Sequence, residues 1–287
     1  MRKYRPIDVI TISYVLFNLL FILLGWGKVI NPHIHFPIYA GIGIIIFFIT
    51  YINESSPKIL QILRDWYPLG FYVYFFETTS NLNQVIFPHF LDNFFQGIDQ
   101  AIFGYQPAMV WGIALDNFFF QELFHFAYFT YYLIPIIFVF IYLKDKQLFH
   151  KFAYTISFVF YACYITYMFL PVIGGRWWEI MEGAEKLTTQ MRYGVFTRIM
   201  ALIYQGTSHQ GGAFPSSHVA VAVVANRMAY LFNKKMGWII LPITILLSIA
   251  TVYCHYHYFI DTIFGLIYGI AFYFVAIKTY DKLIKKL

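Results

Sequence analysis

Long apolar runs separated by short polar segments dominate the chain, and this pattern predicts a helical membrane protein. A helix crosses a bilayer with roughly 18 or more apolar residues, and eight runs approach or exceed that length. They are Val9–Trp26, Phe36–Ile52, Trp66–Phe87, Phe118–Leu143, Phe152–Pro171, Phe214–Phe232, Trp238–Tyr256 and Phe259–Ile277. A membrane β-barrel would instead show short segments of alternating polarity. We therefore predict an all-α fold, a polytopic bundle of about eight transmembrane helices.

Two of these runs need comment. The third contains Glu77 and several other polar residues, which makes it the weakest of the eight. The first follows the basic segment "MRKYR", as the apolar part of a signal peptide would. It is too long for a signal peptide and has no small-residue cleavage site, so we expect it to be an anchor.

The composition agrees with a membrane location. Hydrophobic residues make up 60% of the 287 residues, charged residues only 12%, and the mean hydropathy is +0.62. A soluble domain carries about twice that fraction of charge. Cys163 and Cys254 lie in or beside apolar runs without a pairing pattern, so we interpret them as small apolar residues.

Basic residues orient the predicted bundle, because short cytoplasmic loops are enriched in Lys and Arg. In the eight-span arrangement most of them fall on one side, the cytoplasmic side: Arg2, Lys3, Arg5, Lys58, Arg64, Lys144, Lys146, Lys151, Lys234, Lys235, Lys278, Lys282, Lys285 and Lys286. This bias accounts for most of the net charge of +6. No basic stripe or binding motif indicates nucleic acid as a partner.

Two exterior segments depart from this simple pattern. Pro88–Phe118 has no Lys or Arg, whereas the loop Gly174–Ala213 carries four of them. Leu91–Gly104 and Thr188–Gly206 combine apolar residues at helical spacing with polar ones, which is typical of interfacial helices. We expect these two helices to cover a site at the outer membrane surface.

Three polar features stand out, because ionisable groups at membrane depth are costly and mark functional sites. They are Arg176 in "GGRWW", His218 in "FPSSH", and His257 with Asp261 in "CHYHYFID". The predicted topology places all three on the outer face. That agreement is informative, because the topology rests on Lys and Arg and not on these histidines.

The spacing of His257 and Asp261 suits catalysis. Residues four apart share one face of a helix, so the carboxylate can hold one imidazole nitrogen protonated and leave the other free as a nucleophile or base. The alternative interpretation is a His–Asp pair that only caps the helix. His218 follows Pro215 and two serines at a helix start. An ordinary N-cap explains the Pro and Ser residues but leaves the histidine unexplained.

A helix N-terminus also binds anions through its free N–H groups and nearby hydroxyls, which makes Ser216 and Ser217 candidate phosphate ligands. The planar fork of Arg176 can bind phosphate through two hydrogen bonds, although the flanking Trp177 and Trp178 also suit a simple interfacial anchor. Together these features predict phosphoryl transfer.

At these residues the sequence resembles the type 2 phosphatidic acid phosphatase superfamily, which includes the vanadium haloperoxidases. Its signature is KxxxxxxRP, PSGH and SRxxxxxHxxxD, and this chain has "PSSH" and "ATVYCHYHYFID". The resemblance implies a six-span catalytic core over roughly Trp66–Ile277, so we expect an N-terminal hairpin at residues 1–65 and a catalytic domain at 66–287. It also implies that no metal or other cofactor is required.

The resemblance assigns roles to the candidate residues. His257 would attack phosphorus and form a phosphohistidine, with Asp261 orienting it. His218 would protonate the leaving oxygen, and Arg176 with Ser216 and Ser217 would hold the phosphoryl oxygens. Water or an alcohol would then take the phosphoryl group.

Departures from the signature indicate a branch of the superfamily. KxxxxxxRP is absent, Ser217 replaces the Gly of PSGH, and Thr251 stands where the third motif has Arg. Fewer cations suit a diester monoanion better than a monoester dianion. With "HYHYFID" and "RDWYP" (Arg64–Pro68), the pattern looks like the sphingolipid-synthase and inositol-phosphorylceramide-synthase branch. That branch implies a membrane phospholipid donor and a lipid alcohol acceptor, with the site on the extracytoplasmic face of the cell membrane.

Other classes of function remain open from the residues alone. Hydrolysis of a phosphatidic acid-like or polyprenyl phosphate would use the same site. A lipid transporter could pass a headgroup along Arg176 and the histidines, with Glu77 inside the third span. A metallohydrolase could use His255, His257 and Asp261, but His255 and His257 would point about 200° apart on a helix, so joint ligation would need a loop there.

Overall fold

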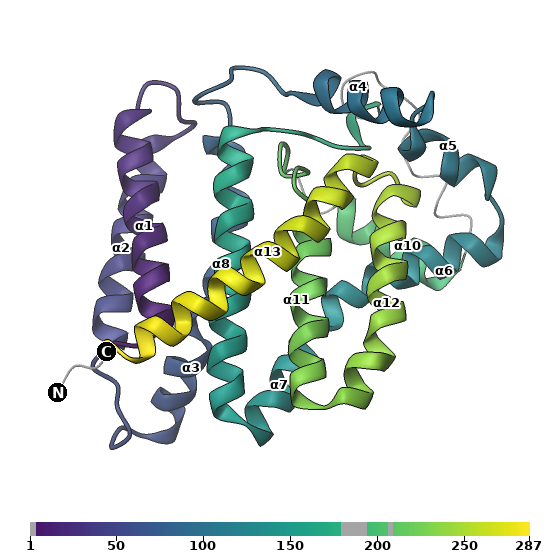
Figure 1. The fold of residues 1–287 in the computed structure, drawn as a ribbon. Coiled ribbons are helices and arrows are strands. Elements are labelled where there is room, and N and C mark those ends of the chain that lie inside the picture. The colour runs from purple at the N-terminus through teal and green to yellow at the C-terminus, as the bar shows by residue number, and fades with distance from the viewer. Residues whose placement is uncertain (1–3, 179–193, 206–208) are drawn as a thin grey trace.

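The computed structural model describes residues 4–178, 194–205 and 209–287. In chain order the helices are α1 (Pro6–Leu24), α2 (Pro32–Ile49), α3 (Lys58–Leu82), α4 (Asp92–Phe103), α5 (Pro107–Ala114), α6 (Phe118–Phe129), a 3-10 turn (Thr130–Leu133), α7 (Ile134–Lys144), α8 (Lys146–Phe169), α10 (Val195–Gln205), α11 (Ser217–Phe232), α12 (Lys234–Tyr253) and α13 (Phe259–Ile284). Figure 1 shows the resulting helical bundle. The predicted all-α fold is confirmed.

Six stretches of the described chain are long and apolar enough to cross a membrane: α1, α2, the α6–α7 unit, α8, α12 and α13. The two remaining predicted spans also form helices. The helix α3 is long but polar, because it carries Arg64, Asp65 and Glu77, and α11 has only 16 residues. The α6–α7 unit is interrupted at Thr130–Leu133, directly before Pro135 at the start of α7. The chain is thus an integral membrane protein.

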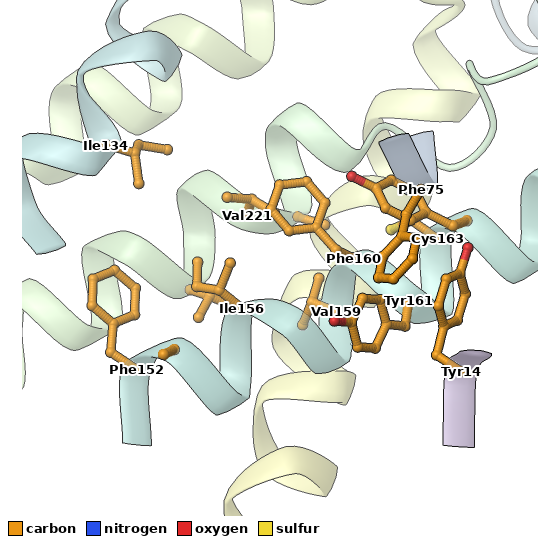
Figure 2. Packing of buried hydrophobic residues seen from close by; sticks show 14 of the residues in the cluster. Tyr14, Phe75, Ile134, Phe152, Ile156, Val159, Phe160, Tyr161, Cys163 and Val221 are labelled. Carbon is orange, nitrogen blue, oxygen red and sulfur yellow. The ribbon is translucent and has the colours of Figure 1, made fainter. Parts of the chain in front are cut away.

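The helix α8 forms the centre of the bundle. It packs against α1, α3, α7, α11 and α13, and most of its residues are buried because they face neighbouring helices on nearly every side. Figure 2 shows this core, in which Phe75, Tyr161 and Tyr14 lie together. The rings of Tyr14 and Tyr161 stack at 4.4 Å between centroids. The core holds side chains from both the N-terminal hairpin and the later helices.

A buried charged cluster joins the N-terminal hairpin to α3. Arg64 forms an ion pair with Asp8, and the hydroxyl of Tyr67 donates a hydrogen bond of 2.6 Å to the same carboxylate. Arg5 contacts Asp65 at 2.6 Å. The "RDWYP" segment therefore anchors α1 in this structure. The division at residues 65 and 66 stays a prediction, and the two parts share one hydrophobic core.

The two ends of the bundle differ. The helices α4 and α5 lie across one end, and α1 begins and α13 ends toward the other (Figure 1). The predicted interfacial helix Leu91–Gly104 corresponds to α4, and part of Thr188–Gly206 corresponds to α10, while the rest of that segment lies outside the described residues. Near the α4 end, α13 crosses α11 closely at Gly265, where an added Cβ would lie 2.7 Å from the Ser216 carbonyl oxygen.

Candidate active site

Three connecting segments meet at the α4 end of the bundle: residues 171–178 after α8, 209–216 before α11, and 254–258 between α12 and α13. Backbone hydrogen bonds hold them together. Ala213 N–H donates to the Val172 carbonyl at 2.8 Å, and Ser216 N–H donates to the Asp261 carbonyl at 3.0 Å. These contacts bring residues that are distant in sequence to the wall of one cavity.

The cavity has a volume of about 130 Å³ and is lined by polar and aromatic side chains. Arg176, His218 and His257 all contribute to its wall. Asp261 lies behind His257 and is fully buried, and Ser216 is also fully buried beside it. The structure therefore brings together five of the six candidate residues. Arg176, His218 and His257 line the cavity, and Asp261 and Ser216 lie beside His257.

His257 lies between two polar side chains. Its Nδ1 atom is 3.6 Å from Oδ2 of Asp261, and its Nε2 atom is 3.2 Å from Oγ of Ser216. Burial lowers the pKa of His257 from 6.5 to about 4. The imidazole is therefore neutral at physiological pH, with Nδ1 toward the carboxylate and Nε2 toward the Ser216 hydroxyl.

The pairing of His257 with Asp261 does not use a shared helix face. His257 precedes α13, which begins at Phe259, so the two residues meet across the turn that enters the helix. Asp261 Oδ2 also accepts a hydrogen bond of 2.9 Å from Tyr258 N–H. The carboxylate thus caps the helix and also faces the histidine, as the capping interpretation expects, while the catalytic role of the pair stays a prediction.

His218 lies in the first turn of α11, and its ring centroid is 5.8 Å from that of His257. The Nε2 atom is 3.0 Å from the hydroxyl of Tyr128, which is 2.6 Å from the hydroxyl of Tyr204. The Nδ1 atom is buried without a hydrogen-bond partner among the described residues. One nitrogen is thus held by a tyrosine pair and the other remains available to a ligand.

The two serines have different surroundings. Ser216 is the N-cap of α11: its Oγ accepts a hydrogen bond of 3.4 Å from Val219 N–H, and the same atom contacts His257. Ser217 instead lines a second, larger cavity. The N–H groups of Ser217 and His218 are first-turn donors without intrahelical acceptors. They remain suited to an anion.

Arg176 follows the turn at Gly174 and is half-buried. Its guanidinium lies 5.1 Å from the centre of the Tyr204 ring, and that ring stacks on Tyr256 at 4.1 Å. Cation–π contact restricts the long side chain, and its Nε atom has no hydrogen-bond partner among the described residues, so the planar fork can bind an anion. The aromatic wall therefore holds Arg176 at the cavity.

An apolar cavity of about 380 Å³ adjoins the polar one. The two share Phe76, Tyr132 and His218 as lining residues. Side chains of α3, α7, α8 and α11 form the rest of the apolar wall, among them Leu69, Val73, Phe138, Ile156 and Val221. An apolar chain of a ligand in this cavity would thus lie directly beside His218.

Sequence reasoning missed His209 and Tyr128. The Nε2 atom of His209 is 2.8 Å from Oγ1 of Thr79, its ring stacks on Phe76 at 3.9 Å, and the residue lines the polar cavity. Burial lowers the pKa of His209 to about 4. Its place in "SHQGGAFPSSH", nine residues before His218, was the one available signal. Nothing in the sequence distinguishes Tyr128 from the many other tyrosines.

His255 lies away from the cavity. Its Nε2 atom fills the space beside Gly112 on α5, at 2.5 Å from where a Cβ would be. The segment does form a turn, as joint metal ligation with His257 would need, but the two rings face different neighbours. Among the described residues no three His, Cys, Asp or Glu side chains gather closely enough to hold a metal ion.

Comparison with known proteins gives three findings. The sequence model of the PAP2 superfamily matches residues 96–275. A PA-phosphatase related-family protein of Dictyostelium discoideum is 39% identical over 65 residues, which is 20% of this chain and 12% of that protein. The chain therefore aligns with only about an eighth of that relative's length. No solved structure matches the chain.

Proposed function

The chain belongs to the PAP2 superfamily, and from this premise we propose that it is an integral membrane enzyme that transfers a phosphoryl group or phospho-headgroup from a lipid phosphoester. The observation that carries the proposal is the pair of histidines His218 and His257, with ring centroids 5.8 Å apart. Both line one cavity with Arg176, and Asp261 supports His257 from behind. A phosphoryl group placed there lies between a nucleophile and an acid.

In the first step, Nε2 of His257 forms a bond to phosphorus while the bond from phosphorus to the lipid oxygen breaks. Asp261 stabilises the proton on Nδ1 and the positive charge that develops on the ring. His218 gives a proton to the leaving oxygen, and the phosphoryl anion beside it stabilises that proton on a ring whose burial otherwise favours the neutral form. Arg176 and the first-turn N–H groups of α11 offset the negative charge on the phosphoryl oxygens.

In the second step, a hydroxyl group attacks the phosphohistidine and the bond from phosphorus to His257 breaks. The proton of that hydroxyl passes to His218, which returns to its starting state. Water as the acceptor gives hydrolysis, and a lipid alcohol gives transfer. We propose transfer to a lipid alcohol, because Arg176 is the only Lys or Arg among the described residues that line the polar cavity, which suits a diester monoanion.

A lipid substrate is supported by the apolar cavity beside His218. Its volume of about 380 Å³ and its apolar wall suit the hydrocarbon chain of a leaving or accepting alcohol. Because His218 lines both cavities, a chain held there places its oxygen next to the proton donor. A water-soluble phosphoester has no group to fill this space.

The distribution of lysine along the chain indicates which side of the membrane the site faces. The lysines at the start of α3, α8 and α12 and at the end of α13 lie at the end opposite the cavity in the predicted topology. Short basic loops favour the cytoplasmic side. We therefore propose that the site faces the extracytoplasmic side of a cell membrane.

The decisive experiment uses purified protein in nanodiscs that contain a fluorescent phospholipid donor and a chelator. We expect a fluorescent product to form only when diacylglycerol or ceramide is added as acceptor. His257→Ala should abolish turnover, because the variant lacks the nitrogen that forms the bond to phosphorus in the first step. Full turnover by this variant would refute the phosphohistidine mechanism.

Controls separate the alternatives. His89→Ala changes an exposed histidine on the same side of the membrane and should retain activity. Product without added acceptor would identify a phosphatase, and loss of activity on chelation would identify a metallohydrolase. Movement of labelled lipid between leaflets without any product would identify a transporter and refute the enzyme proposal.

A further inference from the structure

The helix α4 does more than cover the outer end of the bundle. Its two acidic residues, Asp92 and Asp99, lie seven positions apart and therefore on one face of the helix. Both are fully buried, at 0% exposure. Neither forms an ion pair with a Lys or Arg among the residues that the structure describes. Buried carboxylates without a cation need other donors, because an unpaired buried charge is costly.

Asp92 obtains its donors from two different parts of the site. Ile173 N–H donates to its two oxygens at 3.1 and 3.0 Å, and Gly174 N–H donates at 2.9 Å. The Tyr258 hydroxyl donates to Oδ1 at 2.8 Å. Gly174 stands two residues before Arg176, and Tyr258 directly follows His257. One carboxylate therefore connects the segment that carries the arginine to the turn that carries the nucleophile.

Further contacts reinforce this connection. The Gln96 side chain donates to the Tyr258 hydroxyl at 2.8 Å, so α4 holds that hydroxyl from two positions. The ring of Trp178 packs edge-on against Tyr258 at 5.9 Å. Tyr258 in turn donates its backbone N–H to Asp261, the partner of His257. The path from Asp92 to the nucleophile thus passes through Tyr258 and Asp261.

Asp99 has a simpler set of partners. Its oxygens accept hydrogen bonds from Phe259 N–H at 2.7 Å and Ile260 N–H at 3.0 Å. These are orphan donors of the first turn of α13, so Asp99 caps that helix from a neighbouring one. It has no contact with the Arg176 segment in the structure. Asp99 therefore provides a matched comparison for Asp92.

We propose that Asp92 is a positioning residue that fixes Arg176 and His257 relative to each other across the polar cavity. The assignment rests on the proposed function, because it concerns the same site. The physical reason is geometric. The two groups lie on separate segments, residues 171–178 and 254–258, and phosphoryl transfer requires both at set distances from one phosphorus atom.

The first test measures activity. Asp92→Asn keeps the shape of the side chain but loses its charge and half of its acceptors. We expect kcat to fall about 10- to 100-fold with KM changed less than threefold, because geometry in the transition state is lost rather than substrate contacts. Tyr258→Phe removes one hydroxyl and should lower kcat about 3- to 10-fold in a chain that folds normally. Asn93→Ala, on the exposed face of α4, should match the wild type.

A double-mutant cycle separates positioning from general support of the fold. If Asp92 acts through Arg176, then Asp92→Asn should cost much less in an Arg176→Ala background than in the wild type. Asp99→Asn should cost the same in both backgrounds. Equal losses from Asp92→Asn in both backgrounds, or a kcat within twofold of wild type for both Asp92→Asn and Tyr258→Phe, would overturn the proposal.

Hydrogen exchange on the full chain supplies a readout that does not depend on activity. Asp92→Asn should accelerate exchange in peptides covering residues 172–176 and 254–260 together, whereas Asp99→Asn should affect only the second. Unchanged exchange in both peptides would overturn the proposal. A wild-type protein without turnover on any lipid phosphoester would refute the proposed function, and the exchange result would still decide whether Asp92 joins the two segments.

Discussion

Gly265 on α13 provides a direct test of how closely the active site depends on helix packing. An alanine there would place its Cβ 2.7 Å from the Ser216 carbonyl oxygen, 3.0 Å from Cβ of Val219 and 3.1 Å from Cβ of Ser216. Two of these three atoms belong to the N-cap of α11. Ordinary contacts begin near 3.4 Å, so α13 and α11 must separate by about 0.7 Å, which is the difference between 3.4 and 2.7 Å.

That separation acts on the candidate catalytic residues. The Ser216–His257 contact of 3.2 Å and the hydrogen bond of 3.0 Å from Ser216 N–H to the Asp261 carbonyl both cross the same helix pair. A misplacement of about 1 Å costs on the order of 100-fold in rate. We therefore expect Gly265→Ala to lower kcat about 10- to 100-fold, which corresponds to roughly 1.4–2.7 kcal/mol of barrier height.

The assay is product formation from a fluorescent phospholipid in nanodiscs, with thermal unfolding measured on the same samples. Gly70→Ala is the matched control, because Gly70 is also helical but has no atom within 4 Å of an added Cβ. It should keep full activity and gain slight stability from helix propensity. A folded Gly265→Ala protein with wild-type kcat would show that the spacing of α11 and α13 does not control the chemistry.

Three further outcomes follow from the site. With a diester substrate of constant charge, activity should persist at pH 5 and fall through pH 4, because the pKa of His257 is lowered to about 4; an acid limb near 6.5 would contradict the burial argument. Tyr128→Phe removes the hydroxyl 3.0 Å from His218 Nε2 and should lower kcat about tenfold; an unchanged kcat would show that this contact is dispensable. Arg176→Lys keeps the charge but loses the planar fork over Tyr204, so kcat/KM should fall at least about tenfold; full activity would indicate that charge alone suffices.

The sequence predicted the spans well because each apolar run must satisfy its own backbone within the membrane, and a helix does so locally. The errors of the sequence prediction concern short segments. Phe118–Leu143 was expected as one helix, whereas Thr130–Leu133 forms a 3-10 turn before Pro135. Pro135 was visible in the sequence, but hydropathy alone does not locate an interruption. The helix α5 was not predicted, since eight apolar residues are too few to give a clear period.

The candidate residues were found because their chemistry is unusual in an apolar chain. His218, His257, Asp261 and Arg176 stand out from their neighbours, and the distribution of lysine predicts that they lie on one side of the membrane. Tyr128 and His209 could not be found in the same way. Tyrosine occurs 25 times and histidine nine times in the chain, so neither type marks a site by itself.

The sequence by itself therefore indicated most of the segments that can cross the membrane and singled out polar residues that are costly at that depth, and it predicts which end of the bundle faces the cytoplasm. The tertiary structure decided how those residues are held: Ser216 against His257, Tyr128 on His218, and Asp92 between the segments of Arg176 and His257. The physical reason is the range of each effect. Hydrophobic transfer acts residue by residue along the chain, whereas these hydrogen bonds join groups 41 to 166 positions apart and exist only after the helices pack.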